Sequence, residues 1–115
     1  MTSLNRVILT GKVVTPPQRH YRPDGLPVIE FPLELNDSED RTGREGGNRI
    51  NIVAIGKWAE LKLDLLQSGQ HLMVVGKLNQ RRWQTPQGKS RTRTEVIATE
   101  LEMIEEQNQT TNPRR

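Results

Sequence analysis

Alternation of apolar and polar residues constrains the fold of this chain more than any other feature of its sequence. It is cleanest over residues 28–36, where Ile29, Phe31 and Leu33 share one face and Glu30 lies on the other. A period of two residues is the period of a half-buried β-strand. We therefore predict strands, separated by turn-forming residues, over residues 4–14, 28–36, 49–56, 70–80 and 91–104.

One segment departs from this period. Trp58, Leu61 and Leu65 recur at helical spacing, which predicts a short amphipathic helix over residues 57–67 that ends before Gly69. The order of elements is then three strands, one helix and two strands. This order is expected of an all-β OB-fold, a five-stranded Greek-key barrel with one short helix between strands three and four. A small SH3-like barrel is the alternative, although it usually lacks a helix of this length at this place.

Polar, turn-rich segments connect these elements. Residues 15–27 are predicted to be a loop that ends in a Pro-Asp-Gly turn, and residues 37–48 a long glycine-rich hairpin loop. The Thr-Pro-Gln-Gly sequence at residues 85–88 predicts the turn of a second hairpin. Pro32 cannot donate a hydrogen bond to a neighbouring strand, so we expect an edge strand or a bulge at that position.

The length of 115 residues predicts a single domain, over residues 1–106, followed by a disordered polar tail over residues 107–115. Hydrophobic residues make up only 32% of the chain, and no apolar run reaches the length of a membrane span. There is no cysteine and no apolar N-terminal segment. We therefore expect a cytoplasmic, nucleoid-associated protein that does not bind a membrane.

No arrangement of residues predicts catalysis. His20 and His71 are the two histidines, which leaves little for a metal site or a histidine-based triad. The serines stand in polar loops without the glycines of a nucleophile elbow. We therefore expect no enzymatic activity, no catalytic residue, no metal ligand and no cofactor.

Charged residues are segregated along the chain. Residues 1–23 and 77–93 contain lysines and arginines but no acid, whereas residues 94–106 contain glutamates but no base. Although the formal net charge is only +3, this segregation predicts a basic face directed at a polyanion.

The basic hairpin over residues 77–93 carries the strongest functional signal. Trp83 can stack a nucleic-acid base there, an interaction worth about 1–3 kcal/mol, or can pack against its own hairpin or a neighbouring subunit. We expect Arg81 and Arg82 to contact phosphates on the same face as Trp83. Trp58, in contrast, is expected in the core or at the barrel end. The candidate binding residues are the cations and aromatics Arg6, Lys12, Arg19, Tyr21, Arg22, Arg49, Lys77, Arg81, Arg82, Trp83, Lys89, Arg91 and Arg93.

Several segments resemble the bacterial single-stranded DNA-binding protein family. They are LNRVILTGKV, VIEFPLELN, IVAIGKWAE and SGQHLMVVGKLNQRRWQTPQGKSRTRTEV, which fall within residues 3–104. The most specific match is G-K-L-x-x-R-x-W-x-x-x-x-G followed by T-E-V, at residues 76–96. The resemblance implies a non-enzymatic OB-fold that forms homotetramers. It also implies that the protein coats single-stranded DNA, without sequence specificity, in replication, repair and recombination.

The chain departs from the family at several aromatic positions. Trp83 matches one stacking aromatic, but Arg49 and Ile55 stand where family members often carry others. A further aromatic is replaced near Glu39 or Asp40. The resemblance therefore implies weaker stacking and a larger contribution from charge. The family's acidic tail with a terminal Pro-Phe, which recruits partner proteins, is missing, and the chain ends in Asn-Pro-Arg-Arg.

Primosomal replication protein N, a close relative with the same fold, is an alternative. It lacks the acidic tail, is a dimer, helps reload the replicative helicase, and is similar to this chain over residues 22–28. A second alternative is an OB-fold module that binds protein through exposed Val53 and Ile55. We expect a homo-oligomer, with a tetramer favoured over a dimer, that covers these residues and Ile8. Replication or primosome proteins are expected as further partners.

Overall fold

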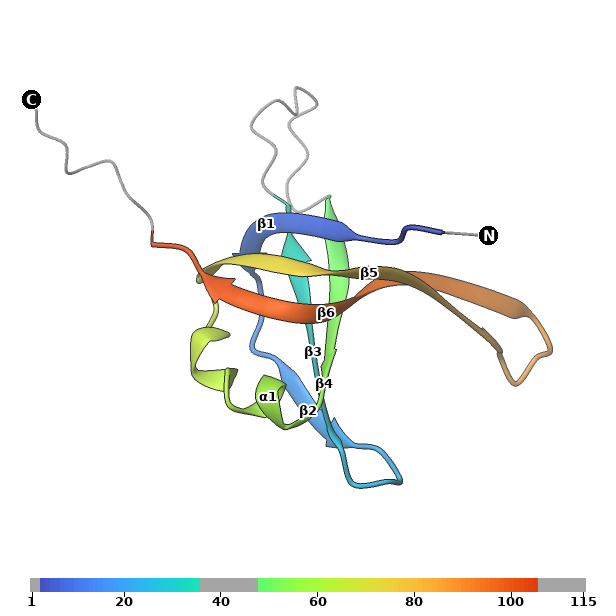
Figure 1. Cartoon of the computed structure of the whole chain (residues 1–115). Helices are drawn as coiled ribbons and strands as arrows, with labels where there is room; N and C mark the ends of the chain where they lie inside the picture. Colours follow the sequence, from blue (N-terminus) through green and yellow to red (C-terminus); the bar gives the residue numbers. More distant parts are fainter. Residues whose placement is uncertain (1–2, 36–47, 106–115) are drawn as a thin grey trace, which may run out of the picture.

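The computed structural model describes residues 3–35 and 48–105. Most of the predicted loop over residues 37–48, and the predicted tail over residues 107–115, therefore lie outside the described residues. The described part consists of strands with two short helical segments (Figure 1). In chain order the elements are β1 (Val7–Val13), β2 (Gln18–Tyr21), β3 (Pro27–Glu34), β4 (Arg49–Ile55), α1 (Lys57–Glu60), a 3-10 helix (Leu63–Leu65), β5 (His71–Gln84) and β6 (Ser90–Met103).

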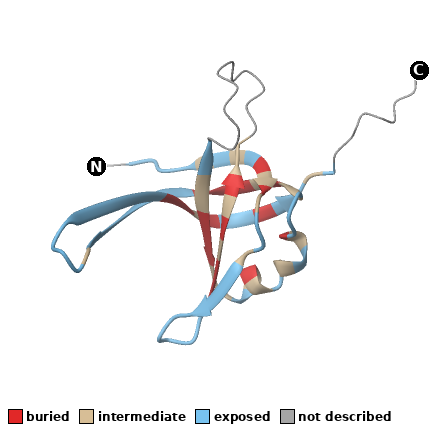
Figure 2. Ribbon diagram, turned by 180° about the vertical axis from the view of Figure 1, so that it is seen from behind, coloured by how far each residue is buried: buried red, intermediate tan, exposed pale blue. Residues whose placement is uncertain are grey.

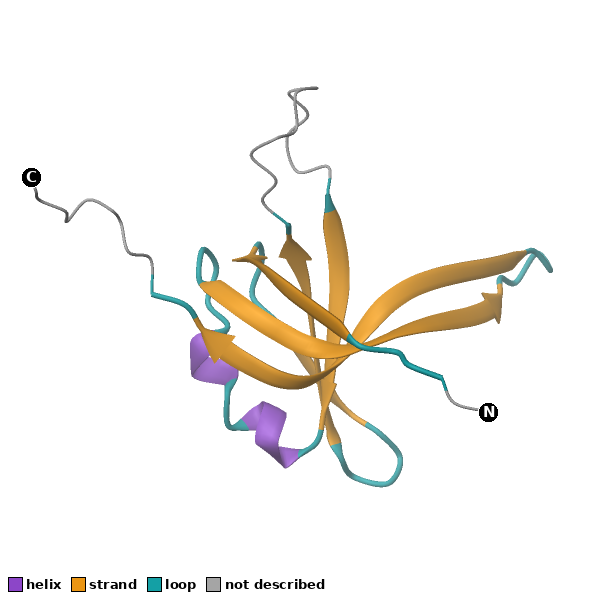
Figure 3. Cartoon of the chain, turned by 45° about the horizontal axis from the view of Figure 1, so that its top comes forward, coloured by secondary structure: helices purple, strands orange, loops and turns teal. Residues whose placement is uncertain are grey.

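The strands form one sheet that closes into a barrel. Neighbouring strands follow the order β1-β5-β6-β4-β3-β2, and β1 also pairs with β3, where Lys12 lies opposite Glu34. The pairing of β4 with β6 is parallel, and the others are antiparallel. The predicted fold class is confirmed, because the strands close into a Greek-key barrel and α1 lies between β4 and β5, which are the predicted third and fourth strands (Figure 3). β2 is an additional strand that is not among the five predicted.

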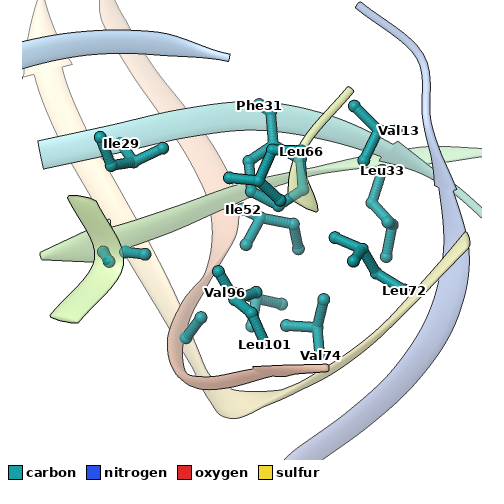
Figure 4. Packing of buried hydrophobic residues seen from close by; sticks show 13 residues of the cluster. Val13, Ile29, Phe31, Leu33, Ile52, Leu66, Leu72, Val74, Val96 and Leu101 are labelled. Carbon is teal, nitrogen blue, oxygen red and sulfur yellow. The ribbon is translucent and has the colours of Figure 1, made fainter. Parts of the chain in front are cut away.

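The apolar core fills the interior of the barrel. Side chains from β1, β3, β4, β5 and β6 converge there, and Leu66 packs among them near Phe31 (Figure 4). Ile29, Phe31 and Leu33 are each at most 1% exposed, so the predicted inward face of β3 is confirmed. Figure 2 shows burial concentrated in the barrel, whereas the distal part of the β5–β6 hairpin is exposed.

The loop predicted over residues 15–27 contains β2, so the prediction of an uninterrupted loop was wrong. All four residues of β2 are exposed, and the strand pairs with β3 through residues 27–30. An exposed polar strand has no apolar alternation that a sequence pattern can detect. Pro32 lies between the residues of β3 that pair with β2 and those that pair with β1, which is where a residue without an N–H is tolerated.

The helix is shorter than the predicted segment over residues 57–67. α1 is a single turn, and Leu61 beyond it is 76% exposed, although the helical stripe predicted that Leu61 faces inward. A single turn makes too few hydrogen bonds to be stable alone. Packing of Ala59 and Trp58 against the core holds it in place.

The β5–β6 hairpin is longer than predicted and projects from the barrel. A bulge between Val75 and Gly76 marks its base, and a Cβ on Gly76 would lie 2.2 Å from the carbonyl oxygen of Ile97. Only glycine allows the two backbones to approach so closely there. Beyond the bulge, antiparallel pairing continues to Gln84 opposite Ser90. We call residues 77–94 the arm (Figure 1).

Candidate nucleic-acid interface

The register of the arm decides which cations lie beside Trp83. Trp83 lies opposite Arg91, and Arg81 lies opposite Arg93. Directly opposite residues in an antiparallel pair project to the same face, and so do residues two apart on one strand. These four side chains therefore share one face of the arm, and Lys77 follows on the same face of β5.

The same face continues from the arm onto β4. Ile52 of β4 and Val96 of β6 are paired and point into the core, so their neighbours Asn51 and Glu95, also paired, point outward. Alternation along β4 places Arg49, Val53 and Ile55 on the same side as Asn51, with Val53 itself buried. We call this surface the outer face, and its residues are Arg49, Asn51, Val53, Ile55, Lys77, Asn79, Arg81, Trp83, Arg91, Arg93 and Glu95.

Two neighbouring hollows cross the outer face, and Arg93 lines both. Arg81, Trp83 and Arg93 line the first, which has a volume of about 380 Å³. The second, of about 270 Å³, lies between Arg93, Asn51 of β4 and the segment that leads into β2. Because Arg93 is common to both, the first hollow lies on the arm and the second lies between Arg93 and residues of β3 and β4.

Lys12 reaches this surface from the edge of the barrel. It lies opposite Glu34 of β3, and Glu34 lies opposite Arg49 of β4, so the three side chains form a row across three strands. The carboxylate therefore has a cation on either side. The prediction that Lys12 extends the basic surface agrees with this placement, although Glu34 offsets part of its charge.

Acidic side chains lie beneath the basic surface, and sequence reasoning missed them. Glu95 is only 3% exposed, its Oε2 accepts a hydrogen bond of 3.1 Å from Asn79, and its Oε1 lies 3.5 Å from Nη2 of Arg81. Glu30 of β3 accepts a hydrogen bond of 3.2 Å from Asn51. Residues 77–93 contain no acidic residue, but the outer face to which they contribute includes the carboxylate of Glu95. The alternation of Arg91, Arg93 and Glu95 was the available signal.

Arg82 is not on the outer face, which corrects the expectation that it acts beside Arg81 and Trp83. Alternation along β5 places Arg82 on the opposite side of the arm, where it lies opposite Thr92. Lys89 lies at the tip, where its N–H donates to the hydroxyl of Thr85 and closes the predicted turn. Arg6 is exposed and precedes β1.

The candidate residues in and after β2, which are Arg19, Tyr21 and Arg22, form contacts away from the outer face. Tyr21 donates a hydrogen bond of 3.0 Å to Oε2 of Glu60 on α1, and Nη1 of Arg19 lies 3.3 Å from the same oxygen. Arg22 forms an ion pair of 2.8 Å with Asp24 within the predicted turn. The structure therefore does not bring these three candidates together with Trp83.

The apolar candidates also differ from expectation. Val53 is 6% exposed, so its own chain covers it and no partner is needed for that purpose. Ile55 is partly buried, whereas Ile8 of β1 is 59% exposed. Trp58 packs against the core, and its indole N–H donates to the carbonyl oxygen of Ile55 at 2.9 Å, which confirms its predicted position.

Residues 3–35 and 48–105 contain no group of three or more histidine and acidic side chains that could hold a metal ion. None of the helices in those ranges is long and apolar enough to cross a membrane.

A Greek-key barrel with a basic outer face and an exposed tryptophan defines the class of OB-fold proteins that bind nucleic acid. Residues 4–104 match the model of the single-strand binding protein family. The chain belongs to this family, whose members are non-catalytic proteins that bind single-stranded DNA.

Individual relatives agree with the family match. The chain is 31% identical to the single-stranded DNA-binding protein of Thermotoga maritima over 101 residues, which cover 85% of this chain and 72% of that protein. It is 32% identical to single-stranded DNA-binding protein A of Bacillus subtilis, with 91% of this chain and 62% of that protein covered. The chain thus spans less than two thirds of the Bacillus protein.

A solved structure resembles the whole barrel. The Plasmodium falciparum SSB complex with ssDNA superposes with a TM-score of 0.76 at 25% identity, and covers 91% of this chain and 98% of that chain. These names favour a single-stranded DNA-binding protein over primosomal replication protein N. The burial of Val53 removes part of the apolar patch that motivated the protein-binding alternative.

Proposed function

We propose that single-stranded DNA lies along the outer face, with one base stacked on Trp83 and phosphates beside Arg91, Arg93 and Arg49. The observation that carries this proposal is the register of the arm, which puts one half-exposed tryptophan among three arginines. Stacking on an aromatic ring is open to every base, and phosphates are the same at every position. Binding is therefore independent of sequence.

The two hollows support a path for the strand. The hollow beside Trp83 offers room for a stacked base, and the second hollow, at Arg93 and Asn51, lies on the way from the arm to β4. On this path the backbone of the strand continues towards Arg49 and Lys12. Among the described residues that line this path, Trp83 is the one exposed aromatic, because Phe31 at the second hollow is only 1% exposed. Arg49 and Ile55 occupy outer-face positions where aromatics are common in the family. Phosphate contacts therefore supply a larger share of the affinity.

We further propose that the protein is a cytoplasmic homo-oligomer, with a tetramer favoured over a dimer, that serves replication, repair and recombination together with replication proteins. Within the described residues, β1 pairs with β5 over Val7–Lys12, but pairs with β3 only at Lys12 and Val13. Exposed Ile8 lies beside the remaining edge. An open strand edge next to an apolar side chain favours pairing with a second copy. A monomer by sedimentation at micromolar concentration would contradict this.

The test of DNA binding is a titration of fluorescently labelled oligo-dT, followed by anisotropy at several salt concentrations. We expect binding that weakens with salt, with a log–log slope of about 0.7 for each phosphate contact. An unlabelled oligo-dT should compete, and a duplex of equal length should compete poorly, because its bases are not free to stack. Equal competition by the duplex would contradict the proposal.

A further inference from the structure

Glu95 is an unusual residue to find beneath a surface that attracts DNA. Glu95 is 3% exposed and lies at the base of the arm, two residues from Arg93 on β6 and diagonally across from Arg81 on β5. Burying a carboxylate costs free energy unless it is paired and hydrogen-bonded. One oxygen accepts a hydrogen bond from Asn79, but the other, Oε1, is buried without a hydrogen bond and has the guanidinium of Arg81 at 3.5 Å.

The arm also places two positive charges close together, and a carboxylate at position 95 reduces their repulsion. Arg81 and Arg93 lie directly opposite each other, and like charges in that arrangement repel. Without a counter-ion, the two guanidinium groups would separate, and the hollow that they form with Trp83 would lose its shape. The side chain of Glu95 is 4% exposed and that of Arg81 is 48% exposed, so loss of Arg81 would leave the buried carboxylate without its cation. This cost favours the arrangement in which Arg81 stays beside Glu95.

From these contacts we infer that Glu95 is a positioning residue of the nucleic-acid interface. It holds Arg81 on the outer face beside Trp83, against the repulsion of Arg93, before DNA arrives. Asn79 fixes the carboxylate so that Oε1 faces Arg81. The inference rests on the proposed DNA-binding function, and it assigns a negative residue a favourable role in binding a polyanion.

Charge alone and positioning predict opposite results for Glu95→Gln. The substitution keeps the size of the side chain and an oxygen for Asn79, but removes the negative charge. Glu105→Gln is the matched control, because it removes one negative charge from an exposed residue beyond the end of β6. If only net charge mattered, both variants would bind oligo-dT at least as tightly as the unmodified chain.

We expect Glu95→Gln to bind oligo-dT about two- to fivefold more weakly than Glu105→Gln, which is the range for a partly exposed ion pair. In an Arg81→Gln background, the substitution of Glu95 should no longer weaken binding, because it has no guanidinium left to position. Equal or tighter binding by Glu95→Gln, or a loss that persists without Arg81, would overturn the inference.

Melting curves show whether Glu95→Gln is folded. If it is not, Asn79→Ala replaces it, because this variant frees the carboxylate without changing any charge. It should weaken binding when Arg81 is present and leave binding unchanged when Arg81 is glutamine. The unmodified chain in the same titration reports on the proposed function. If the unmodified chain did not bind oligo-dT, both the proposed function and this inference would be wrong. If the unmodified chain bound oligo-dT and the Glu95→Gln and Glu105→Gln variants bound it equally well, only the inference would be wrong.

Discussion

Replacing Trp83 with alanine should reduce DNA affinity and should cost less stability than replacing an aromatic side chain of the core. The side chain is 44% exposed, so a little over half of its surface is covered within the chain. Deleting a fully buried aromatic costs about 3–5 kcal/mol of stability, which scales to about 2 kcal/mol for a half-covered one. Loss of one stacked base costs about 1–3 kcal/mol of binding, or about 5- to 150-fold in Kd.

The assay measures both quantities on each variant, by urea unfolding and by oligo-dT anisotropy. Trp58→Ala is the comparison, because Trp58 packs against the core and its N–H bonds to Ile55. Because Trp58 is partly buried and also loses its hydrogen bond, Trp58→Ala should lose about 3 kcal/mol of stability or more, while the folded protein keeps its affinity. If Trp83→Ala instead lost stability to the same extent and kept its affinity, Trp83 would be a packing residue and the stacking argument would fail.

Two further substitutions test the placement of the arm and of β2. Gly76→Ala should destabilise the protein by about 1–3 kcal/mol in urea unfolding, because the new Cβ would meet the backbone at Ile97. A variant as stable as the unmodified chain would argue against the close approach of the two strands. Tyr21→Phe removes the hydrogen bond to Glu60 on the side away from Trp83. It should leave oligo-dT affinity unchanged within twofold, and a large loss would place β2 in the DNA path.

Much of the fold could be predicted from the sequence, because burial leaves a periodic pattern. The inward residues of β3 repeat at every second position, and the order of strands and helix indicated the barrel. β2 could not be predicted, since its four exposed residues depend on pairing with β3 and not on burial. The helix was overestimated because apolar residues after Glu60 follow a helical spacing that the chain breaks with a 3-10 turn.

The binding site was predicted less completely than the fold. The sequence indicated the basic hairpin and Trp83, but the face of each residue depends on register. Arg81 and Arg82 are neighbours, so in a strand they would point to opposite faces. This signal was not used because the predicted strand ended at residue 80. Glu95 was missed because its charge suggests an exposed residue. Its burial follows from the meeting of β4, β5 and β6, which no local pattern reveals.

The central claim, that DNA lies on the outer face of the arm, is tested most directly by comparing Arg93→Gln with Arg82→Gln. Both variants lose one positive charge from the arm, but Arg93 lines both hollows on the face of Trp83, whereas Arg82 lies on the opposite side. The measurement is the salt dependence of oligo-dT affinity. Arg93→Gln should lower the log–log slope by about 0.7, and Arg82→Gln should leave it unchanged. Equal slopes for the two variants, or the larger drop for Arg82→Gln, would contradict the account.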